Sequence, residues 1–287
     1  MRLGRSLLIA ATAVLLSTAT GVASASSIGP GLGRVKVNLH GLQFDVFTYR
    51  PDCPDPNLLL VFHGLNRNAQ GYNNRARILG DKLCMIVVTP LFDSKRFPSW
   101  RYQRAGVVRG NTVQKRSDWT ARYVFDLIAW VRREEGRPLR YAMIGHSAGA
   151  QFLSRLAAFT PTEAQRIVIA NPSTYVFATT RRKAPYGFGG VYRGAAEETM
   201  LRRYLKAPVT IYLGKEDVGD ENRNDSREAR AQGKTRYDRG RNAFRTARAL
   251  ARKRNWEFNW RLVELPGVGH SSGRMFRASQ ALDALAR

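Results

Sequence analysis

Residues 145–149 read Gly-His-Ser-Ala-Gly, a serine with one glycine two positions before it and another two positions after it. An apolar run at 141–144 precedes this pentapeptide, and a helix-compatible stretch at 151–159 follows it. Glycine at both places removes the Cβ atoms that would clash where a strand turns sharply into a helix. The spacing therefore predicts that Ser147 is lifted out of the backbone as a nucleophile.

A serine hydroxyl is a poor nucleophile until a base takes its proton, and a carboxylate orients that base. Of the four histidines, His270 lies in a Gly-rich loop directly after the last predicted strand, where it can reach the carboxyl edge of a sheet. The carboxylate is expected from the loop after the preceding strand. Asp217 is the leading candidate there, with Asp220 and Glu216 as alternatives. We predict a triad of Ser147, Asp217 and His270.

Attack of a serine on a carbonyl group also needs donors for the negative charge that develops on the substrate oxygen. The backbone N–H of Ala148, directly after the serine, is one expected donor. The second is expected from Leu65, which follows His63 and Gly64 at the end of the apolar run 58–62. The sequence thus predicts an oxyanion hole formed by Leu65 and Ala148.

The segments that must position these residues alternate between strand and helix patterns. Residues 35–39 and 42–49 alternate apolar and polar side chains with period two, which is typical of a half-buried antiparallel hairpin. The later strand candidates are continuous apolar runs, at 58–62, 85–88, 141–144, 166–170, 208–213 and 261–265. Helical patterns lie between them, including one capped at 117–118 and a closing one at 275–286. We predict an α/β fold with a mostly parallel central sheet, an antiparallel N-terminal hairpin and helices on both faces.

The predicted domain organisation starts with a targeting segment. Residues 1–25 combine two arginines, a short apolar core and an Ala-Ser-Ala end, which together are typical of a secretory signal peptide. Residues 26–287 are expected to form one domain, in which the polar and aromatic segment 179–206 is a candidate cap or lid over the pocket. No later stretch is long enough for a transmembrane segment. We therefore expect a periplasmic or secreted protein.

Both cysteines of the chain, Cys53 and Cys84, lie just before predicted neighbouring strands. An exported chain with an even number of cysteines is expected to form disulfides. Pairing of the two strands would bring the cysteines together at one end of the sheet, so we predict a Cys53–Cys84 disulfide.

The chain carries 47 Lys and Arg residues against 22 Asp and Glu, a formal net charge of +25 at pH 7. Such an excess favours electrostatic association with anionic envelope surfaces, such as lipopolysaccharide or acidic polysaccharide. A solvated surface in a protein of Arg-rich composition is the plainer interpretation. Specific nucleic-acid binding is not expected, because the arginines are scattered rather than clustered with aromatic residues.

The motifs resemble those of the α/β-hydrolase superfamily. The resemblance is carried by His63-Gly64-Leu65, by the pentapeptide at 145–149, by residues 214–217 and by Gly269-His270. Within the superfamily, the chain is similar to the secreted bacterial branch that contains polyhydroxybutyrate depolymerases and feruloyl esterases. The resemblance implies a serine esterase fold in which nucleophile, acid and histidine follow one another in this order along the chain.

The substrate pocket is expected at the edge of the sheet where these loops meet. Asn66, Trp100 and Tyr175 lie in those loops and are the predicted substrate contacts. Residues 220–224 match the first three ligand positions of a calcium loop, but Asp225 and Ala231 stand where that loop has its glycine and its final glutamate. The sequence also has no phosphate-binding glycine loop and no zinc-ligand spacing, so no cofactor or metal is expected. We predict an exported serine hydrolase that cleaves small-molecule or polymeric carboxylic esters through an acyl-enzyme. A non-catalytic protein that binds anionic envelope polymer through its basic surface is the alternative.

Overall fold

The computed structural model describes residues 28–286 of the chain. The predicted signal peptide, residues 1–25, therefore lies outside the described residues. Within the described part of the chain, no helix is both long and apolar enough to cross a membrane.

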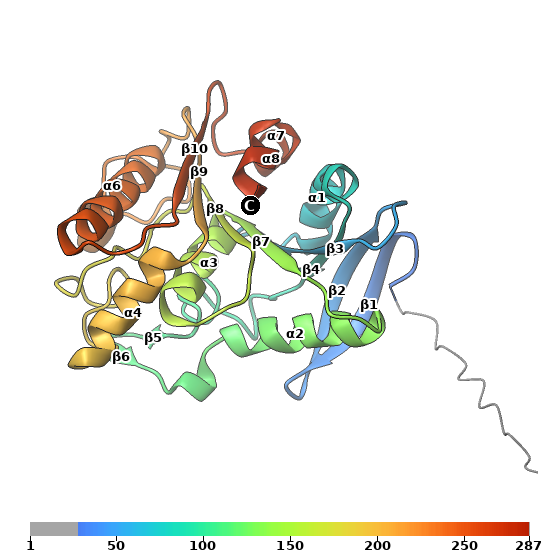
Figure 1. The fold of residues 1–287 in the computed structure, drawn as a ribbon, viewed down its shortest axis with the longest axis horizontal. Coiled ribbons are helices and arrows are strands. Elements are labelled where there is room, and N and C mark those ends of the chain that lie inside the picture. Colours follow the sequence, from blue (N-terminus) through green and yellow to red (C-terminus); the bar gives the residue numbers. More distant parts are fainter. Residues whose placement is uncertain (1–27, 287) are drawn as a thin grey trace, which may run out of the picture.

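Among residues 28–286, a sheet of eight strands runs through the molecule in the order β1-β2-β4-β3-β7-β8-β9-β10 (Figure 1). Its strands are β1 (Gly31–Leu39), β2 (Leu42–Arg50), β3 (Asn57–Phe62), β4 (Met85–Pro90), β7 (Tyr141–His146), β8 (Arg166–Ala170), β9 (Val209–Gly214) and β10 (Arg261–Leu265). The pairs β1–β2 and β2–β4 are antiparallel, whereas the pairs from β4–β3 to β9–β10 are parallel. The predicted fold class, a mostly parallel sheet that begins with an antiparallel hairpin, is confirmed.

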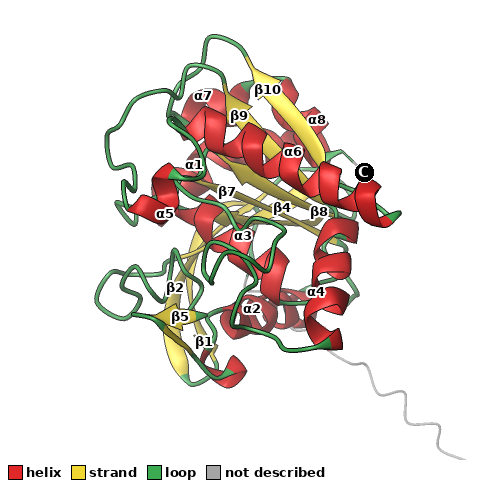
Figure 2. Ribbon diagram, turned by 90° about the vertical axis from the view of Figure 1, so that its left-hand side faces the viewer, coloured by secondary structure: helices red, strands yellow, loops and turns green. Residues whose placement is uncertain are grey.

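Helices cover both faces of this sheet, and Figure 2 shows the face on which α6 lies. One face is covered by α1 (Ala69–Leu83), α7 (Ser272–Arg277) and α8 (Gln280–Leu285). The other is covered by α2 (Ala121–Glu134), α3 (Ala148–Phe159), α4 (Ala195–Lys206) and α6 (Arg236–Arg254). The shorter elements are β5 (Val108–Arg109), β6 (Thr112–Val113), a 3-10 turn at Arg116–Asp118 and α5 (Arg227–Arg230).

The alternation of strand side chains explains the two helical layers. In β3, Leu58, Leu60 and Phe62 belong to the core shared with α2 and α3. Leu59 and Val61 belong to the core shared with α1 and α7. All five side chains are 0 % exposed, because successive residues of a strand point to opposite faces. Burial on both faces is the reason that this strand is a continuous apolar run.

A disulfide joins Cys53 and Cys84, as predicted. Cys53 precedes β3, and Cys84 lies between the end of α1 and the start of β4. These two strands pair in parallel from Asn57 and Met85 onward. The bridge therefore connects the amino ends of two neighbouring strands, at the edge of the sheet away from Ser147.

Residues 179–206, the predicted cap or lid, end in helix α4. This helix packs against α3 and α6 within one of the helical layers. The described residues that line the pocket around Ser147 come from other segments of the chain. The assignment of this segment as a cap or lid stays a prediction.

Candidate active site

Ser147 lies between β7 and α3, at the turn that the glycine spacing predicts. Its backbone has φ 57° and ψ −115°, a conformation that residues with a side chain rarely adopt. A Cβ on Gly145 would lie 2.5 Å from the backbone of Gly149, and a Cβ on Gly149 would lie 2.2 Å from the carbonyl oxygen of Phe62. Both glycines are therefore required, because β7, α3 and β3 meet at this turn without room for side chains.

Three side chains from three loops form a hydrogen-bonded row. The Nε2 of His270 lies 3.0 Å from the Oγ of Ser147, and the Nδ1 of His270 lies 2.7 Å from the Oδ2 of Asp217. Asp217 is 1 % exposed. The alternative acids Glu216 and Asp220 are both exposed to solvent and take no part in the row. This geometry suits transfer of the serine proton to an imidazole that a carboxylate holds in place.

Asn171 holds the acid loop and the histidine loop together. Its Oδ1 accepts a hydrogen bond from the N–H of Gly214 at 3.0 Å, and its Nδ2 donates to the carbonyl oxygen of Gly269 at 3.4 Å. The N–H of Glu216 also donates to the carbonyl oxygen of Val268, at 3.1 Å. These bonds set the separation of the two loops that carry the acid and the histidine. The sequence held no signal for Asn171 beyond its position directly after β8.

Arg236, the first residue of α6, is a second partner of Asp217. Its Nη1 lies 3.4 Å from the Oδ1 of Asp217, and both side chains are at most 2 % exposed. A capping box between Thr235 and Asp238 starts α6 at this point, and the guanidinium also donates to backbone carbonyls of the loop before α5. Burial lowers the pKa of Arg236, and the charge of Asp217 opposes that shift. Sequence reasoning missed this residue, because nothing in the arginine-rich helix distinguishes it from its exposed neighbours.

The two predicted oxyanion donors lie in backbone that is held in place. Ala148 is the first residue of α3, so its N–H has no acceptor within the helix. The carbonyl oxygen of Gly64 accepts from the Nδ1 of His63 at 3.0 Å and from the N–H of Arg67 at 3.2 Å. Because the C=O and N–H of a trans peptide point in opposite directions, these bonds turn the N–H of Leu65 away from the imidazole ring. Leu65 lines the same pocket as the serine.

His63 is a buried histidine that fixes the loop of Leu65, the predicted oxyanion donor. Its Nε2 accepts from the N–H of Phe92 at 3.1 Å, so the proton that it donates to Gly64 is carried by Nδ1. The side chain is 0 % exposed, and burial lowers the pKa of His63 to about 4. The ring is therefore neutral at pH 7 and can both donate and accept.

His146, the residue before the nucleophile, packs against His270 with the two ring centroids 4.6 Å apart. The Nδ1 of His146 lies 3.0 Å from the hydroxyl of Tyr72. Burial, followed by the charge of the neighbouring His270, lowers the pKa of His146 well below its ordinary value. The ring of His146 is therefore neutral at pH 7.

A pocket of about 470 Å³ opens around Ser147 and His270, a volume typical of small-molecule sites. Asn66, a predicted substrate contact, is among the residues that line it. Helix α1 starts at the pocket because Asn68 caps it, accepting from the N–H of Gly71 at 2.8 Å. Across residues 28–286, no group of three or more His, Cys, Asp or Glu side chains is placed to hold a metal ion.

The other two predicted substrate contacts lie elsewhere. Trp100 is not one of the described residues that line the pocket, and the guanidinium of Arg109 lies 5.2 Å from the centroid of its ring. Tyr175 is 1 % exposed and belongs to the core. Its hydroxyl would lie only 2.7 Å from a Cβ on Gly240 of α6. The prediction that Tyr175 contacts substrate is therefore wrong, because its side chain packs beneath α6.

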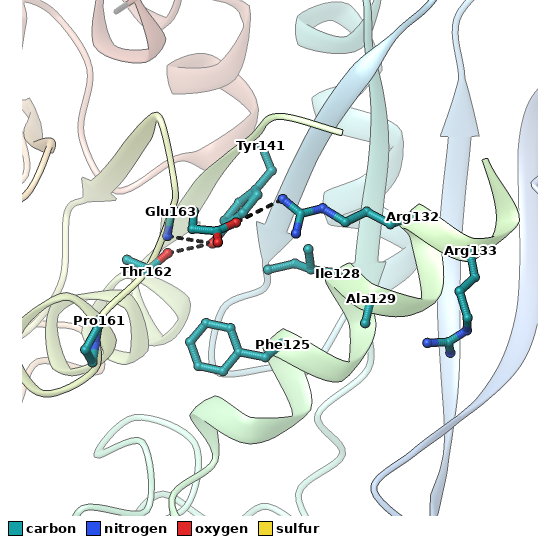
Figure 3. Close-up of a pocket in the computed structure, with 9 residues that line it drawn as sticks. All are labelled: Phe125, Ile128, Ala129, Arg132, Arg133, Tyr141, Pro161, Thr162 and Glu163. Carbon is teal, nitrogen blue, oxygen red and sulfur yellow. Dashed lines mark hydrogen bonds and ion pairs between the residues drawn. The ribbon is translucent and has the colours of Figure 1, made fainter. Parts of the chain in front are cut away.

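A second hollow, of about 630 Å³, opens at the opposite end of β7, beside α2 (Figure 3). There, Arg132 pairs with Glu163 at 3.1 Å, and the hydroxyls of Tyr141 and Thr162 lie 2.7 Å apart. These polar groups satisfy one another, and no side chain of the hydrogen-bonded row lies among the nine residues that Figure 3 labels. Ser147 and His270 line the other pocket, of about 470 Å³.

Comparisons with known proteins identify the family. A scan against protein-family models finds no match, and neither does a search of the curated proteins. Among solved structures, a poly(aspartic acid) hydrolase from Sphingomonas sp. KT-1 is 30% identical, with a TM-score of 0.81 over 88% of this chain and 98% of its own. The chain belongs to the α/β-hydrolase family.

Two further structures resemble this hydrolase to different degrees. A poly(3-hydroxybutyrate) depolymerase from Bordetella parapertussis is 28% identical, with a TM-score of 0.81 over 88% of this chain and 90% of its own. A fluorophosphonate-binding serine hydrolase from Staphylococcus aureus is 13% identical, with a TM-score of 0.53 over 88% of this chain and 97% of its own, and it shares the fold. The resemblance that the sequence motifs indicated is confirmed, and the protein is an esterase-like serine hydrolase by family.

Proposed function

We propose that this α/β hydrolase is an exported enzyme that cleaves carboxylic esters through an acyl-enzyme. The observation that carries the proposal is the unbroken row from Ser147 through His270 to Asp217, with distances of 3.0 Å and 2.7 Å. Such a row activates a hydroxyl that is otherwise a poor nucleophile.

In the first half of the reaction, the Oγ of Ser147 attacks the carbonyl carbon of the ester while its proton moves to the Nε2 of His270. Asp217 accepts the hydrogen bond from Nδ1 and stabilises the imidazolium. The N–H groups of Leu65 and Ala148 bind the oxyanion of the tetrahedral intermediate. Collapse of this intermediate breaks the bond to the alcohol oxygen, and the alcohol leaves with the proton from His270.

In the second half, a water molecule attacks the acyl carbon and gives a proton to His270. Collapse breaks the bond to the Oγ of Ser147, which takes that proton back, and the carboxylic acid leaves. Amide cleavage or acyl transfer would use the same residues. We favour esters, small or polymeric, because the depolymerase relative at 28% identity acts on a polyester.

Export is part of the proposal. Residues 1–25 have the pattern of a signal peptide, and the Cys53–Cys84 disulfide suits an oxidising compartment. We therefore place the enzyme in the periplasm or outside the cell, where its net charge of +25 would attract it to anionic envelope surfaces. The proposed reaction uses no cofactor.

Hydrolysis of p-nitrophenyl esters from acetate to palmitate, together with a feruloyl ester, tests the proposal. Ser147→Ala should lower kcat by about six orders of magnitude, and Asp217→Asn by about four. Asp220→Asn is the matched control, because Asp220 is exposed and lies outside the hydrogen-bonded row. It should keep wild-type activity.

A wild-type chain as inactive as Ser147→Ala on every ester would contradict the proposal. Labelling with a fluorophosphonate then separates the remaining cases. A labelled Ser147 would mean an active serine hydrolase with another substrate. An unlabelled serine would favour the alternative, a non-catalytic protein that binds anionic envelope polymer through its basic surface.

A further inference from the structure

Two arginines line the pocket on the side of α1 and α7. Arg75 comes from α1, Arg277 is the last residue of α7, and both lie among the residues around Ser147. A Cβ on Gly273 would lie 3.5 Å from the Cδ of Arg75 and 3.4 Å from the Nη1 of Arg277. Because both side chains approach the same glycine, they share one wall of the pocket.

Neither arginine has a carboxylate partner within residues 28–286, where the salt bridges involve other cations. The guanidinium of Arg75 lies over the ring of Tyr72, 5.5 Å from its centroid, and stacking of this kind leaves the N–H edge available to a ligand. The buried Arg236 and Arg239, by contrast, donate to carbonyl and carboxylate oxygens of the chain. Arg75 and Arg277 therefore have guanidinium N–H groups that form no ion pair within residues 28–286 and can bind a ligand.

The described residues that line this pocket include no aspartate or glutamate. Apart from the two arginines, its polar side chains are amides, hydroxyls and histidines, among them Asn66, Asn222 and Ser272. The pocket next to Ser147 is therefore lined by two positively charged side chains and by no negatively charged one. A cleft with charges of one sign concentrates ligands of the opposite sign.

We propose that Arg75 and Arg277 bind a carboxylate of the substrate, so that the hydrolase selects esters that carry a free carboxylate near the scissile bond. This rests on the proposed function, because it names the substrate class of the same site. Planar guanidinium groups match carboxylates through parallel N–H···O bonds. The class includes half-esters of dicarboxylic acids. It also includes acid-terminated oligomers, because each cut of a polyester leaves a carboxylate at a new chain end.

Two matched substrate pairs test the proposal and show on which side of the scissile bond the carboxylate lies. Monoethyl adipate against ethyl hexanoate places the carboxylate in the acyl part. 4-(Butanoyloxy)benzoate against 4-(butanoyloxy)benzamide places it in the leaving group. For each pair, the measured quantity is the ratio of kcat/KM for the anionic ester to kcat/KM for the neutral ester.

In at least one pair, the wild-type ratio should exceed that of the double variant Arg75→Gln, Arg277→Gln by about tenfold or more, the usual effect of hydrogen bonds to a charged group. The loss should appear mainly in the KM of the anionic ester. The double variant Arg75→Lys, Arg277→Lys should recover part of the ratio, because it restores the charge without the planar fork.

The double variant Arg77→Gln, Arg248→Gln is the matched control. It removes the same charge from exposed positions of α1 and α6 that lie outside the pocket, and it should keep the wild-type ratio. A ratio that falls equally in this control would assign the preference to long-range attraction by the basic surface and overturn the proposal. Equal ratios in the wild type and in the Arg75→Gln, Arg277→Gln variant, for both pairs, would overturn it as well.

Failure of the proposed function is recognised separately. If no ester is hydrolysed, binding of 4-(butanoyloxy)benzoate and of monoethyl adipate to the Ser147→Ala protein, measured by calorimetry, still tests the arginines. Binding that weakens about tenfold or more when Arg75→Gln and Arg277→Gln are added supports the carboxylate site. Binding that is absent, or equal with and without the two arginines, overturns it.

Discussion

Both oxygens of Asp217 are engaged, Oδ2 by the Nδ1 of His270 and Oδ1 by the Nη1 of Arg236. A carboxylate that is 1 % exposed needs such partners, because an unpaired buried charge is strongly destabilising. The guanidinium compensates part of the carboxylate charge and holds Oδ1 in place, so Arg236 is a positioning residue for Asp217.

Replacing Arg236 by Gln should lower the free energy of unfolding by about 3 kcal/mol, because it leaves the buried carboxylate of Asp217 without its guanidinium partner. Urea unfolding at neutral pH measures this loss.

The conservative variant Arg236→Lys should lose less stability, because it keeps the charge beside Asp217. Arg248→Gln, an exposed position on the same helix, controls for the general loss of one positive charge and should keep wild-type stability. Equal stability of the wild type and Arg236→Gln would show that the buried pair does not stabilise the fold.

The side chains of the hydrogen-bonded row could be singled out from the sequence because each has a local signal. Ser147 is flanked by glycines, and His270 is the histidine in the loop after the last strand. Arg236 and Asn171 could not be found in this way, since their contacts depend on distances between loops that only the tertiary structure sets. Tyr175 was placed wrongly for the same reason. An aromatic side chain after a strand can point into the core or into a pocket, and packing decides which.

At the scale of the elements, the nucleophile turn depends on how closely α3 approaches β3. A Cβ on Gly149 would lie 2.2 Å from the carbonyl oxygen of Phe62 and 2.8 Å from that of His63. Helix α3 is buried along most of its length, so it cannot move outward without disturbing the core. The position of Ser147 is therefore set by the contact of a helix with a strand.

Gly149→Ala should lower the free energy of unfolding by about 1–3 kcal/mol, the usual cost of overpacking. It should also lower kcat, because the added methyl group pushes α3, and Ser147 with it, away from the oxyanion loop. Denaturant unfolding and ester hydrolysis measure the two effects. The control is Gly29→Ala, where no atom lies within 4 Å of the added Cβ. Wild-type stability and activity in Gly149→Ala would contradict the conclusion that the contact of α3 with β3 sets the position of Ser147.

The order of the elements was predicted more closely than their ends. The sequence predicts that the pair at 117–118 caps a helix, but those residues belong to a 3-10 turn and α2 begins only at Ala121. The closing helix predicted at 275–286 is divided into α7 and α8, with Ala278 extended between them. Apolar periodicity indicates that a segment is helical, but it does not reveal a break of two residues between two short helices.

At the scale of the whole molecule, the buried His63 makes folding stability depend on pH. The pKa of His63 is lowered from 6.5 to about 4 in the folded protein, so between these values the unfolded chain binds more protons than the folded one. Stability is then fully present above the ordinary pKa and is lost as pH falls toward the folded pKa. Between pH 7 and pH 5, the free energy of unfolding should fall by about 2 kcal/mol from this histidine.

Urea unfolding at the two pH values measures this loss. His63→Asn should have a lower stability at neutral pH but a smaller difference between the two pH values. His40→Gln is the control, since the side chain of His40 is 54% exposed and its removal should leave the difference unchanged. An equal pH dependence in wild type and His63→Asn would show that other groups cause the acid sensitivity.

The sheet and its helical layers could be predicted over most of the chain, because alternating strand and helix patterns leave few arrangements open. The pocket could not be predicted in the same detail. Its wall combines Arg75 of α1 with Arg277 of α7, and no local pattern relates two residues so far apart in the sequence.

The disulfide makes the free energy of unfolding depend on the redox state of the surroundings. Cys53 and Cys84 are separated by 31 positions, and closing a loop of that length stabilises a folded domain by about 4 kcal/mol in the chain-entropy account. The free energy of unfolding of an ordinary domain is only about 5–15 kcal/mol. A thiol reductant would therefore raise the unfolded fraction by a factor of several hundred, at about 1.4 kcal/mol per factor of ten. A copy retained in a reducing compartment would therefore unfold more often and be cleaved by proteases more readily.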